Sequence, residues 1–257
     1  IQTVLFSPED LNLMKEGPGV RRRFCNIALS QLKPRYLQAL SEYQRVLEQK
    51  NKLLRGFAQT TETERLCEVY NDRLAAVGSI LVTQRAQFLR ELGESASKIH
   101  GEMSGERETL SVRYRTDRMI EDPFGDFKLI EQSLREHLEL RKKAEQEAQT
   151  SLVGPHRDDM ECFINDKPVR QFASQGQTRT AVLALKLAER HVFQAATGAF
   201  PVLLLDDVLS ELDAGRRNYV LNQIRAGQVF ITSCEPDLTQ TVRAGRLFTV
   251  QNGCVSG

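Results

Sequence analysis

The residues PVLLLDDVLSELD, from Pro201 to Asp213, place two adjacent aspartates at the end of a short apolar run. Runs of this kind are typical of central strands in a buried sheet. Such a strand holds its terminal carboxylate at the carboxyl edge of the sheet, where α/β folds bind ligands. There, one carboxylate can hold Mg²⁺ and its neighbour can orient a water molecule toward a γ-phosphate. A purely structural strand, whose aspartates cap whatever follows, is the alternative.

A metal site of the DDxxD type is a rival chemical interpretation of the same aspartates. The sequence argues against it in two ways. The third acidic position is Ser210, and the aspartates of such sites lie on helices rather than at the end of a strand. Of the two metal sites we therefore favour the Walker B kind, and a purely structural strand stays open.

A second stretch, FASQGQTRTAVLALKLAE, spans Phe172 to Glu189 ahead of the aspartates. It predicts a Ser-x-Gly-Gln turn that enters a helix. A serine hydroxyl, a glycine that permits close backbone approach and a helix N-terminus make an anion site, although a plain capped helix has the same pattern. Behind the aspartates follows SELD, Ser210 to Asp213. A signature loop, a Walker B strand and a D-loop in this order are typical of an ABC-type ATPase head.

The residue pattern divides the chain into three parts. Residues 1–33 open with a β-rich run followed by helical segments, and they form the entry segment of a head. Residues 34–149 are rich in Glu, Gln, Lys, Arg, Leu and Ala at helical spacing, which predicts a helical arm domain. Residues 150–257 alternate short apolar strands with a strongly helical stretch, which predicts a sheet with helices against it. The helical middle is therefore an excursion from one α/β head.

The middle segment carries two signals against one continuous rod. Its apolar stripe breaks at Gln84 and Arg85, so we expect packed antiparallel helices rather than a long coiled coil. Glycines at positions 93, 101 and 105 predict a weakened far end. The residues TLSVRYRT, 109–116, alternate as a strand does.

Composition narrows the classes of function. The chain has 257 residues with 35 Lys and Arg against 34 Asp and Glu, so a DNA-binding surface has to come from local clusters. Five scattered cysteines without a CxxC pair argue against a disulfide framework or a zinc site. No apolar run is long enough for a membrane helix, which favours a cytoplasmic protein. Two basic clusters are candidates for DNA phosphates, although charge runs are usually solvated faces: Arg21, Arg22, Arg23 and Arg141, Lys142, Lys143.

Four stretches together resemble the RecF family of bacterial recombination mediators, in the SMC-like branch of the ABC ATPases. They are FSPEDLNLMKEGPGVRRRF, GPHRDD, FASQGQTRTAVLALKLAE and LLLDDVLSELD. The resemblance covers both ends of the chain well and the helical middle loosely. It implies an α/β fold, with a partial ABC-type ATPase head interrupted by a helical arm domain.

The resemblance also implies a function and partners. It implies an ATP-dependent DNA-binding protein that is active in repair and forms a homodimer around two nucleotides. No membrane partner is implied. Such a protein works with RecR and RecO on double-stranded DNA or at junctions with single strands. There it directs RecA loading at gapped or stalled DNA, in association with the nucleoid.

Roles for individual residues follow from the resemblance by position. Asp206 would hold Mg²⁺ and Asp207 would position the attacking water. Ser174, Gly176 and Gln177 would reach the γ-phosphate of an ATP molecule that the opposite subunit holds.

The D-loop residues Ser210 and Asp213 would lie at the dimer seam.

The strand QVFITSC is followed by no histidine, unlike the equivalent strand of many ABC heads, so a γ-phosphate sensor there would be another residue. No GxxxxGK[ST] P-loop occurs among the 257 residues. In this family the P-loop lies in an N-terminal portion, so we expect a fragment that begins after it. We expect slow, regulatory ATP hydrolysis from the complete protein and none from this chain alone.

Other classes of protein stay open as alternatives. An SMC-type structural DNA clamp would need much longer heptad arms, and the long helical insertion argues against a transporter ATPase. This chain alone could also be a non-catalytic interaction module. In GPHRDD, His156 and Arg157 are expected to fix a turn by hydrogen bonds rather than to contact DNA or nucleotide.

Overall fold

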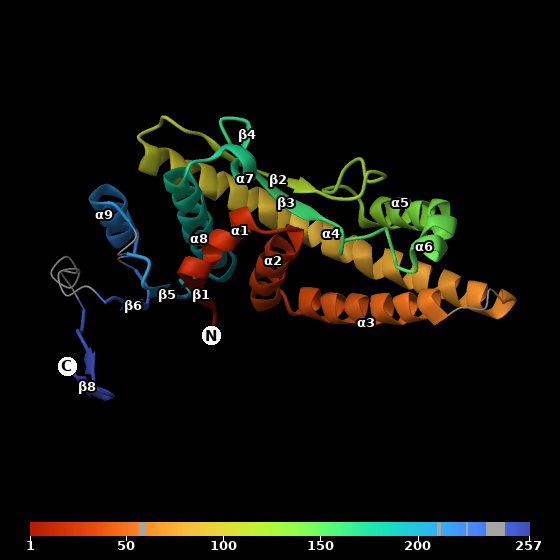
Figure 1. Cartoon of the computed structure of the whole chain (residues 1–257), viewed down its shortest axis with the longest axis horizontal. Coiled ribbons are helices and arrows are strands. Elements are labelled where there is room, and N and C mark those ends of the chain that lie inside the picture. Colours follow the sequence, from red (N-terminus) through yellow and green to blue (C-terminus); the bar gives the residue numbers. More distant parts are fainter. Residues whose placement is uncertain (57–59, 210–211, 225, 235–244) are drawn as a thin grey trace.

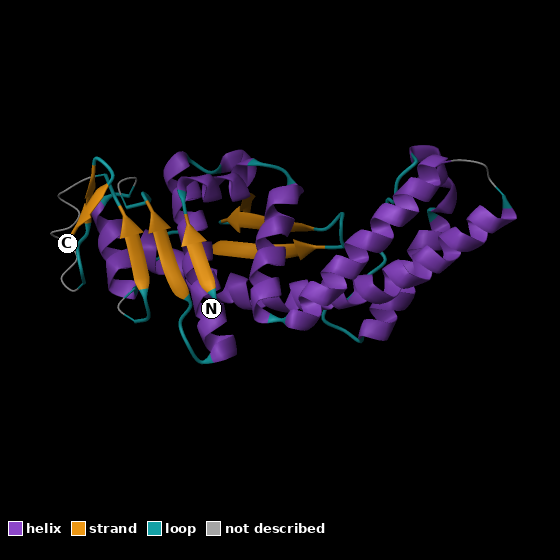
Figure 2. Ribbon diagram, turned by 90° about the horizontal axis from the view of Figure 1, so that it is seen from below, coloured by secondary structure: helices purple, strands orange, loops and turns teal. Residues whose placement is uncertain are grey.

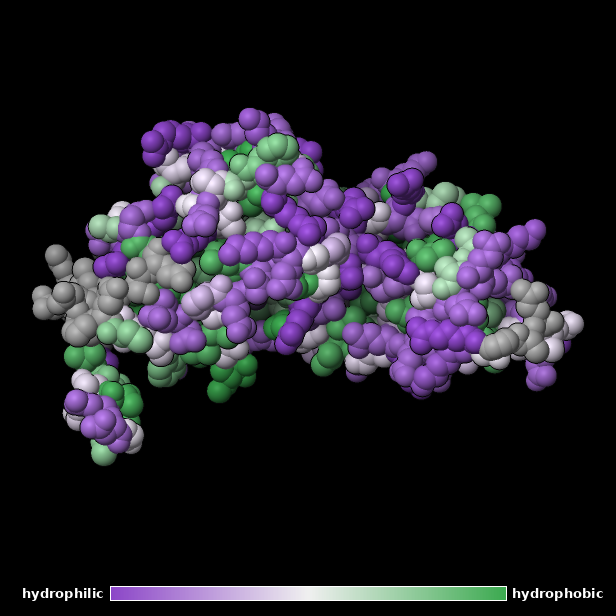
Figure 3. Space-filling model, in the orientation of Figure 1, coloured by the Kyte–Doolittle hydropathy of each residue, from purple (hydrophilic) through white to green (hydrophobic). Residues whose placement is uncertain are grey.

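The computed structural model of the chain describes residues 1–56, 60–209, 212–224, 226–234 and 245–257 (Figure 1). The molecule is elongated, with a parallel sheet of three strands toward one end and a group of long helices at the other (Figure 2). Helix α4, Thr61–Ser104, runs between these two ends. Hydrophilic side chains cover most of the face seen in Figure 3. The mixed α/β architecture that the sequence predicts is confirmed.

The parallel sheet positions the two aspartates. Its order is β1–β5–β6, with β1 at Thr3–Phe6, β5 at Val202–Asp206 and β6 at Val229–Thr232. One face of β1 and β5 belongs to the hydrophobic core, together with helix α8, Gln175–Thr197. Since strand β5 lies between the other two and its residues alternate toward this core, its carboxyl end is held in a fixed place.

The opposite face of this sheet carries an apolar row. The register aligns Leu5 with Leu204 and Leu204 with Phe230. Leu5 is 48% exposed and Phe230 is 53% exposed. Among the described residues, no element covers this row as α8 covers the inner face.

Four helices form the arm: α3 (Pro34–Gly56), α4, α5 (Phe127–Leu140) and α6 (Lys142–Ala148). Helices α3 and α5 pack against α4, so the expectation of packed helices is confirmed. The expectation of a weakened far end is wrong, because α4 is one helix of 44 residues that continues through Gly93 and Gly101. It ends only at Gly105, which adopts the left-handed conformation of a helix C-cap with φ 64°.

A second, antiparallel sheet joins the arm to the head. Its order is β2–β3–β4, with β2 at Leu110–Arg115, β3 at Asp159–Ile164 and β4 at Lys167–Pro168. The strand predicted within residues 109–116 is thus confirmed. Because β2 follows the arm helix α4 and β3 belongs to the C-terminal part, the sheet spans the predicted boundary at residue 150. The division into residues 1–33, 34–149 and 150–257 stays a prediction.

The remaining elements are short or lie at the ends of the chain. Asn252 and Gly253 both have positive φ, as the two-residue turn of the C-terminal hairpin requires. Among the described residues, no helix is long and apolar enough to cross a membrane. The remaining helices and strands of the described residues are η1 (Pro8–Leu11), α1 (Asn12–Lys15), α2 (Pro18–Leu32), α7 (Val169–Phe172), α9 (Ala214–Gln223), β7 (Thr249–Gln251) and β8 (Cys254–Ser256).

Candidate functional site

The two aspartates lie at the carboxyl edge of the parallel sheet, as predicted. Asp206 is the last residue of β5, and its side chain is exposed. Thr232, the last residue of β6, donates its hydroxyl to Asp206 Oδ1 at 2.6 Å. The backbone N–H of Asp207 in turn donates to Thr232 Oγ1 at 3.1 Å and to the Thr232 carbonyl at 3.3 Å. Thr232 therefore fixes both aspartates, a role that the sequence did not reveal.

Asp207 has an unusual backbone conformation. Its φ is 52°, in the left-handed region, which costs a non-glycine residue on the order of 1 kcal/mol. The two hydrogen bonds from its N–H to Thr232 compensate for this cost. The left-handed residue bends the chain directly after β5.

The D-loop prediction is covered only in part. Ser210 lies outside the described residues. Asp213 is the N-cap of α9: its Oδ1 accepts from the Arg216 N–H at 2.9 Å, and Oδ2 forms an ion pair with the Arg216 guanidinium. The hydrogen bond from this backbone N–H lowers the pKa of Asp213, so the exposed carboxylate is charged at neutral pH.

The signature turn, Ser174–Gln177, begins helix α8 with a complete capping box. Ser174 Oγ accepts from the Gln177 N–H at 3.2 Å, and Gln177 Oε1 accepts from the Ser174 N–H at 2.9 Å. The Thr178 N–H donates to the Ser174 carbonyl at 2.9 Å. Among the hydrogen bonds of the described residues, the N–H groups of Gln175 and Gly176 have no acceptor. These two donors and the exposed Ser174 hydroxyl stand at the positive end of a 23-residue helix.

Gly176 leaves this turn open. A Cβ atom built on it would meet only Ser174 Oγ, at 4.0 Å, within a radius of 4 Å. An anion could therefore approach the backbone closely. Among the described residues, no hydrogen bond or ion pair joins the signature turn to Asp206 or Asp207. The turn at Ser174–Gln177 and the aspartates at the end of β5 are therefore described as two separate groups of residues.

The Gln177 side chain lies differently from the expectation that it reaches a γ-phosphate. Its amide Nε2 donates to Glu108 Oε1 at 2.8 Å, so in this structure the side chain points into its own subunit. Glu108 precedes β2 and lies 69 positions earlier in the chain, so no local sequence signal predicts it.

The first basic cluster is mostly engaged inside the protein. Arg21 is 6% exposed and donates to both oxygens of Asp159, at 2.7 and 2.9 Å. Arg22 donates to the Asp158 carbonyl at 2.7 Å, whereas Arg23 is exposed. Arg21 is therefore not available to a DNA phosphate, because its guanidinium group binds the Asp159 carboxylate and so joins α2 to β3.

The second basic cluster lies on the arm, where α5 meets α6. Arg141 and Lys143 are exposed, and Lys142 donates to Glu68 at 3.2 Å. The side chains of Arg141 and Lys143 are thus accessible to solvent, and their contact with DNA stays a prediction.

The turn GPHRDD is fixed by side chains, as predicted. His156 Nε2 lies 3.1 Å from the Ser151 carbonyl, to which Arg157 also donates at 2.8 Å. The Tyr43 hydroxyl lies 2.7 Å from His156 Nδ1. Burial lowers the pKa of His156 to about 4, so its ring is neutral at neutral pH.

Comparisons with known proteins show the family of the chain. No protein-family model matches the chain. The DNA replication and repair protein RecF of Bacillus subtilis is 39% identical over 259 residues, which cover 99% of this chain and 70% of the relative. RecF of Symbiobacterium thermophilum is 40% identical over 259 residues, with 99% and 68% covered.

Solved structures agree with this relationship. A structure of the recombination mediator protein RecF with ATP, in the RecFOR pathway, superposes with a TM-score of 0.88 at 34% identity. It matches 99% of this chain and 66% of its own chain. The sequence resemblance, the helical arm and the aspartates at the sheet edge thus agree, and the chain belongs to the RecF family of DNA replication and repair proteins.

Proposed function

We propose that this chain contributes the signature and Walker B half of an ATP-dependent RecF dimer. In ABC-type heads each nucleotide lies between the P-loop of one subunit and the signature turn of the other. The observation that carries the proposal is the exposed set of donors in the signature turn: the Ser174 hydroxyl and the N–H groups of Gln175 and Gly176. Such donors at a helix N-terminus suit the γ-phosphate of a partner's ATP.

The aspartates suit Mg²⁺ binding and water activation in the same reaction. An exposed carboxylate at the sheet edge, oriented by the Thr232 hydroxyl, is the hard oxygen ligand that Mg²⁺ prefers, with water and phosphate oxygens completing its shell. Asp206 would hold the ion, which when bound neutralises phosphate charge. Asp207 would orient the attacking water, and Asp213 would lie near the dimer seam. Hydrolysis would then be slow and would regulate dimer opening.

On this proposal the dimer acts on DNA in repair. It would bind double-stranded DNA or junctions with single strands, and it would work with RecR and RecO to direct RecA loading at gaps. The names of the relatives, DNA replication and repair protein RecF, and the RecFOR pathway of the solved structure support this assignment.

The test uses the Ser174–Gln177 turn, which we propose is the signature, and the lack of a GxxxxGK[ST] motif among the 257 residues. Alone, it should bind ATP negligibly, because one capped helix end cannot replace the amides and lysine of a P-loop. It should be mixed with a RecF subunit that binds ATP and carries arginine in place of its own signature serine. Light scattering should then detect a heterodimer that forms only with ATP, because this chain offers the intact signature.

The control variants lie in this chain. Ser174→Arg should abolish the ATP-dependent association, since it fills the turn with a bulky cation. Ser41→Arg, at an exposed serine of α3, should leave the association unchanged. Association that is equally strong without ATP, or that tolerates Ser174→Arg, would show that the signature assignment is wrong.

A further inference from the structure

The amide of Gln177 is held at both ends. Oε1 accepts from the Ser174 N–H at 2.9 Å, and Nε2 donates to Glu108 Oε1 at 2.8 Å. Since one end of the amide needs a donor and the other an acceptor, the two contacts together fix its orientation. Without the Glu108 contact, the amide could rotate away from Ser174 and the capping box would lose one of its two bonds.

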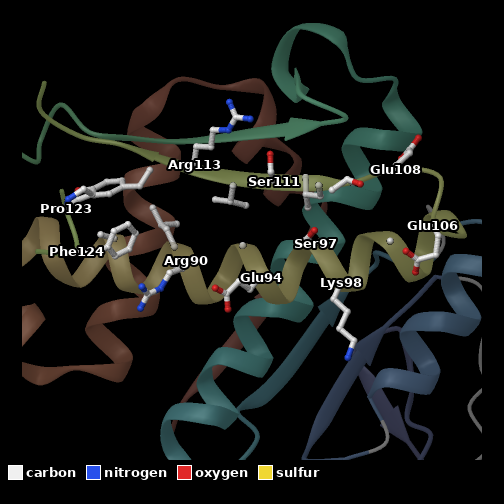
Figure 4. A pocket seen from close by; sticks show the side chains of 18 residues that line it. Arg90, Glu94, Ser97, Lys98, Glu106, Glu108, Ser111, Arg113, Pro123 and Phe124 are labelled. Carbon is white, nitrogen blue, oxygen red and sulfur yellow. The ribbon is translucent and has the colours of Figure 1, made fainter. Parts of the chain in front are cut away.

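Glu108 is itself held by the arm helix. Its second oxygen, Oε2, lies 3.1 Å from Nε2 of His100, a fully buried residue of α4. The backbone N–H of Glu108 donates to Ser104 Oγ at 3.3 Å, in the last turn of the same helix. The segment after α4 is thereby anchored, at the end of a groove of about 810 Å³ between α4 and β2 (Figure 4).

The charge of Glu108 suits the role of an acceptor. Although partial burial alone would raise it, the hydrogen bonds from Gln177 and His100 bring the pKa of Glu108 below its usual value. Burial lowers the pKa of His100, so a neutral ring that carries its proton on Nε2 donates to a charged carboxylate. Hydrogen bonds to a charged acceptor are stronger than neutral ones.

We propose that Glu108 is a positioning residue for the signature turn. It holds the Gln177 amide on the Ser174 N–H, so that the Ser174 hydroxyl and the N–H groups of Gln175 and Gly176 face the partner's nucleotide. Through His100, this position depends on the arm helix α4. The inference rests on the proposed function, and it adds a residue that does not itself touch ATP.

The experiment compares substitutions at Glu108 in the ATP-dependent association with the RecF subunit described above. Glu108→Ala removes the acceptor and should weaken the ATP-dependent association by about tenfold, the effect of losing one charged hydrogen bond. Glu108→Gln keeps an oxygen for Gln177 and can offer its amide N–H to the other tautomer of His100. It should restore most of the affinity.

Two controls separate positioning from folding. Glu94→Ala, at an exposed carboxylate that lines the same groove, should leave the association unchanged. The thermal midpoint of the isolated chain should be nearly the same for Glu94→Ala and Glu108→Gln, and it should fall modestly for Glu108→Ala, which leaves the buried His100 Nε2 without this acceptor. Wild-type association by Glu108→Ala would overturn the proposal. So would an equal loss in Glu108→Ala and Glu108→Gln that follows a lowered thermal midpoint.

The failure of this inference differs from that of the proposed function. If Ser174→Arg abolishes the ATP-dependent association while Glu108→Ala does not weaken it, the proposed function stands and only the role of Glu108 is lost. If neither substitution changes the association, the signature assignment itself is wrong.

Discussion

At the scale of single residues, His156 links the GPHRDD turn to the arm. Tyr43, on α3, contacts His156 Nδ1, and a Cβ atom on Gly154 would collide with the Tyr43 hydroxyl. Gly154 has a φ of 122°, a conformation that favours glycine. The turn therefore depends on a neutral, hydrogen-bonded imidazole inside the protein.

This dependence predicts a loss of stability in acid. The pKa of His156 is lowered to about 4 in the folded chain and is about 6.5 in the unfolded chain. Between these values the unfolded state binds a proton that the folded state lacks, so the free energy of unfolding falls as the pH drops from about 6.5 to about 4. The loss from this one group is at most about 3 kcal/mol.

Urea unfolding of wild type and His156→Gln across this range measures the contribution. Glutamine can accept from Tyr43 and donate to the Ser151 carbonyl without titrating, so the variant should lose less stability in acid. His100 and His191, whose pKa values burial also lowers, are common to both chains. Identical pH profiles for the two chains would contradict a buried, neutral His156.

Sequence patterns located the site residues that belong to one local motif. Ser174 and Gln177 form a capping box with each other, and Asp206 ends a strand, so spacing alone suffices for both. Thr232 and Glu108 act on these residues from 26 and 69 positions away, and only the folded chain brings them there.

At the scale of elements, Arg85 and Gly93 interrupt the sequence pattern of α4 for reasons of tertiary packing, and neither ends the helix. Arg85 interrupts the apolar stripe, yet it is 3% exposed and donates to Asp158, the Pro155 carbonyl and Tyr36. Its charge is satisfied inside the protein, so the helix continues. Gly93 likewise lies where β2 crosses α4, and a Cβ atom on it would lie 3.2 Å from the Val112 Cβ.

This close approach makes Gly93 a packing position, and Gly93→Leu tests it. Leucine gains about 1 kcal/mol of helix propensity over glycine but forces α4 and β2 apart. We expect a net loss of about 1–3 kcal/mol in the free energy of unfolding. Denaturant unfolding measures it, and Glu94→Leu, on the exposed side of the same turn, should change stability by less than about 0.5 kcal/mol. A more stable Gly93→Leu chain would mean that propensity outweighs packing here.

At the scale of the whole molecule, the basic arm surface predicts how DNA binding responds to salt. The ATP-dependent dimer should bind duplex DNA with little regard to sequence, because lysine and arginine contact phosphates. The slope of log K against log salt should be about −0.9 for each phosphate neutralised. Reversing the charges of Arg141, Lys142 and Lys143 should make the slope shallower, since Arg141 and Lys143 are exposed.

Fluorescence anisotropy over a series of salt concentrations gives both slopes. The comparison variant is Arg23→Glu, which reverses the exposed charge of the other basic cluster. If the arm variant keeps the wild-type slope while Arg23→Glu makes the slope shallower, the DNA lies along the head and the arm contributes nothing.

The unbroken helix α4 also has a mechanical consequence. At 1.5 Å per residue, its 44 residues make a rod about 66 Å long. Near its C-terminal end, Glu102 accepts from the Tyr219 hydroxyl of α9 at 2.6 Å, and His100 contacts Glu108. A tilt of about 5° at that end would carry the other end of such a rod through roughly 6 Å. Because α4 is one continuous helix, we expect a displacement of its distant end to reach the residues that hold Glu108 and Tyr219.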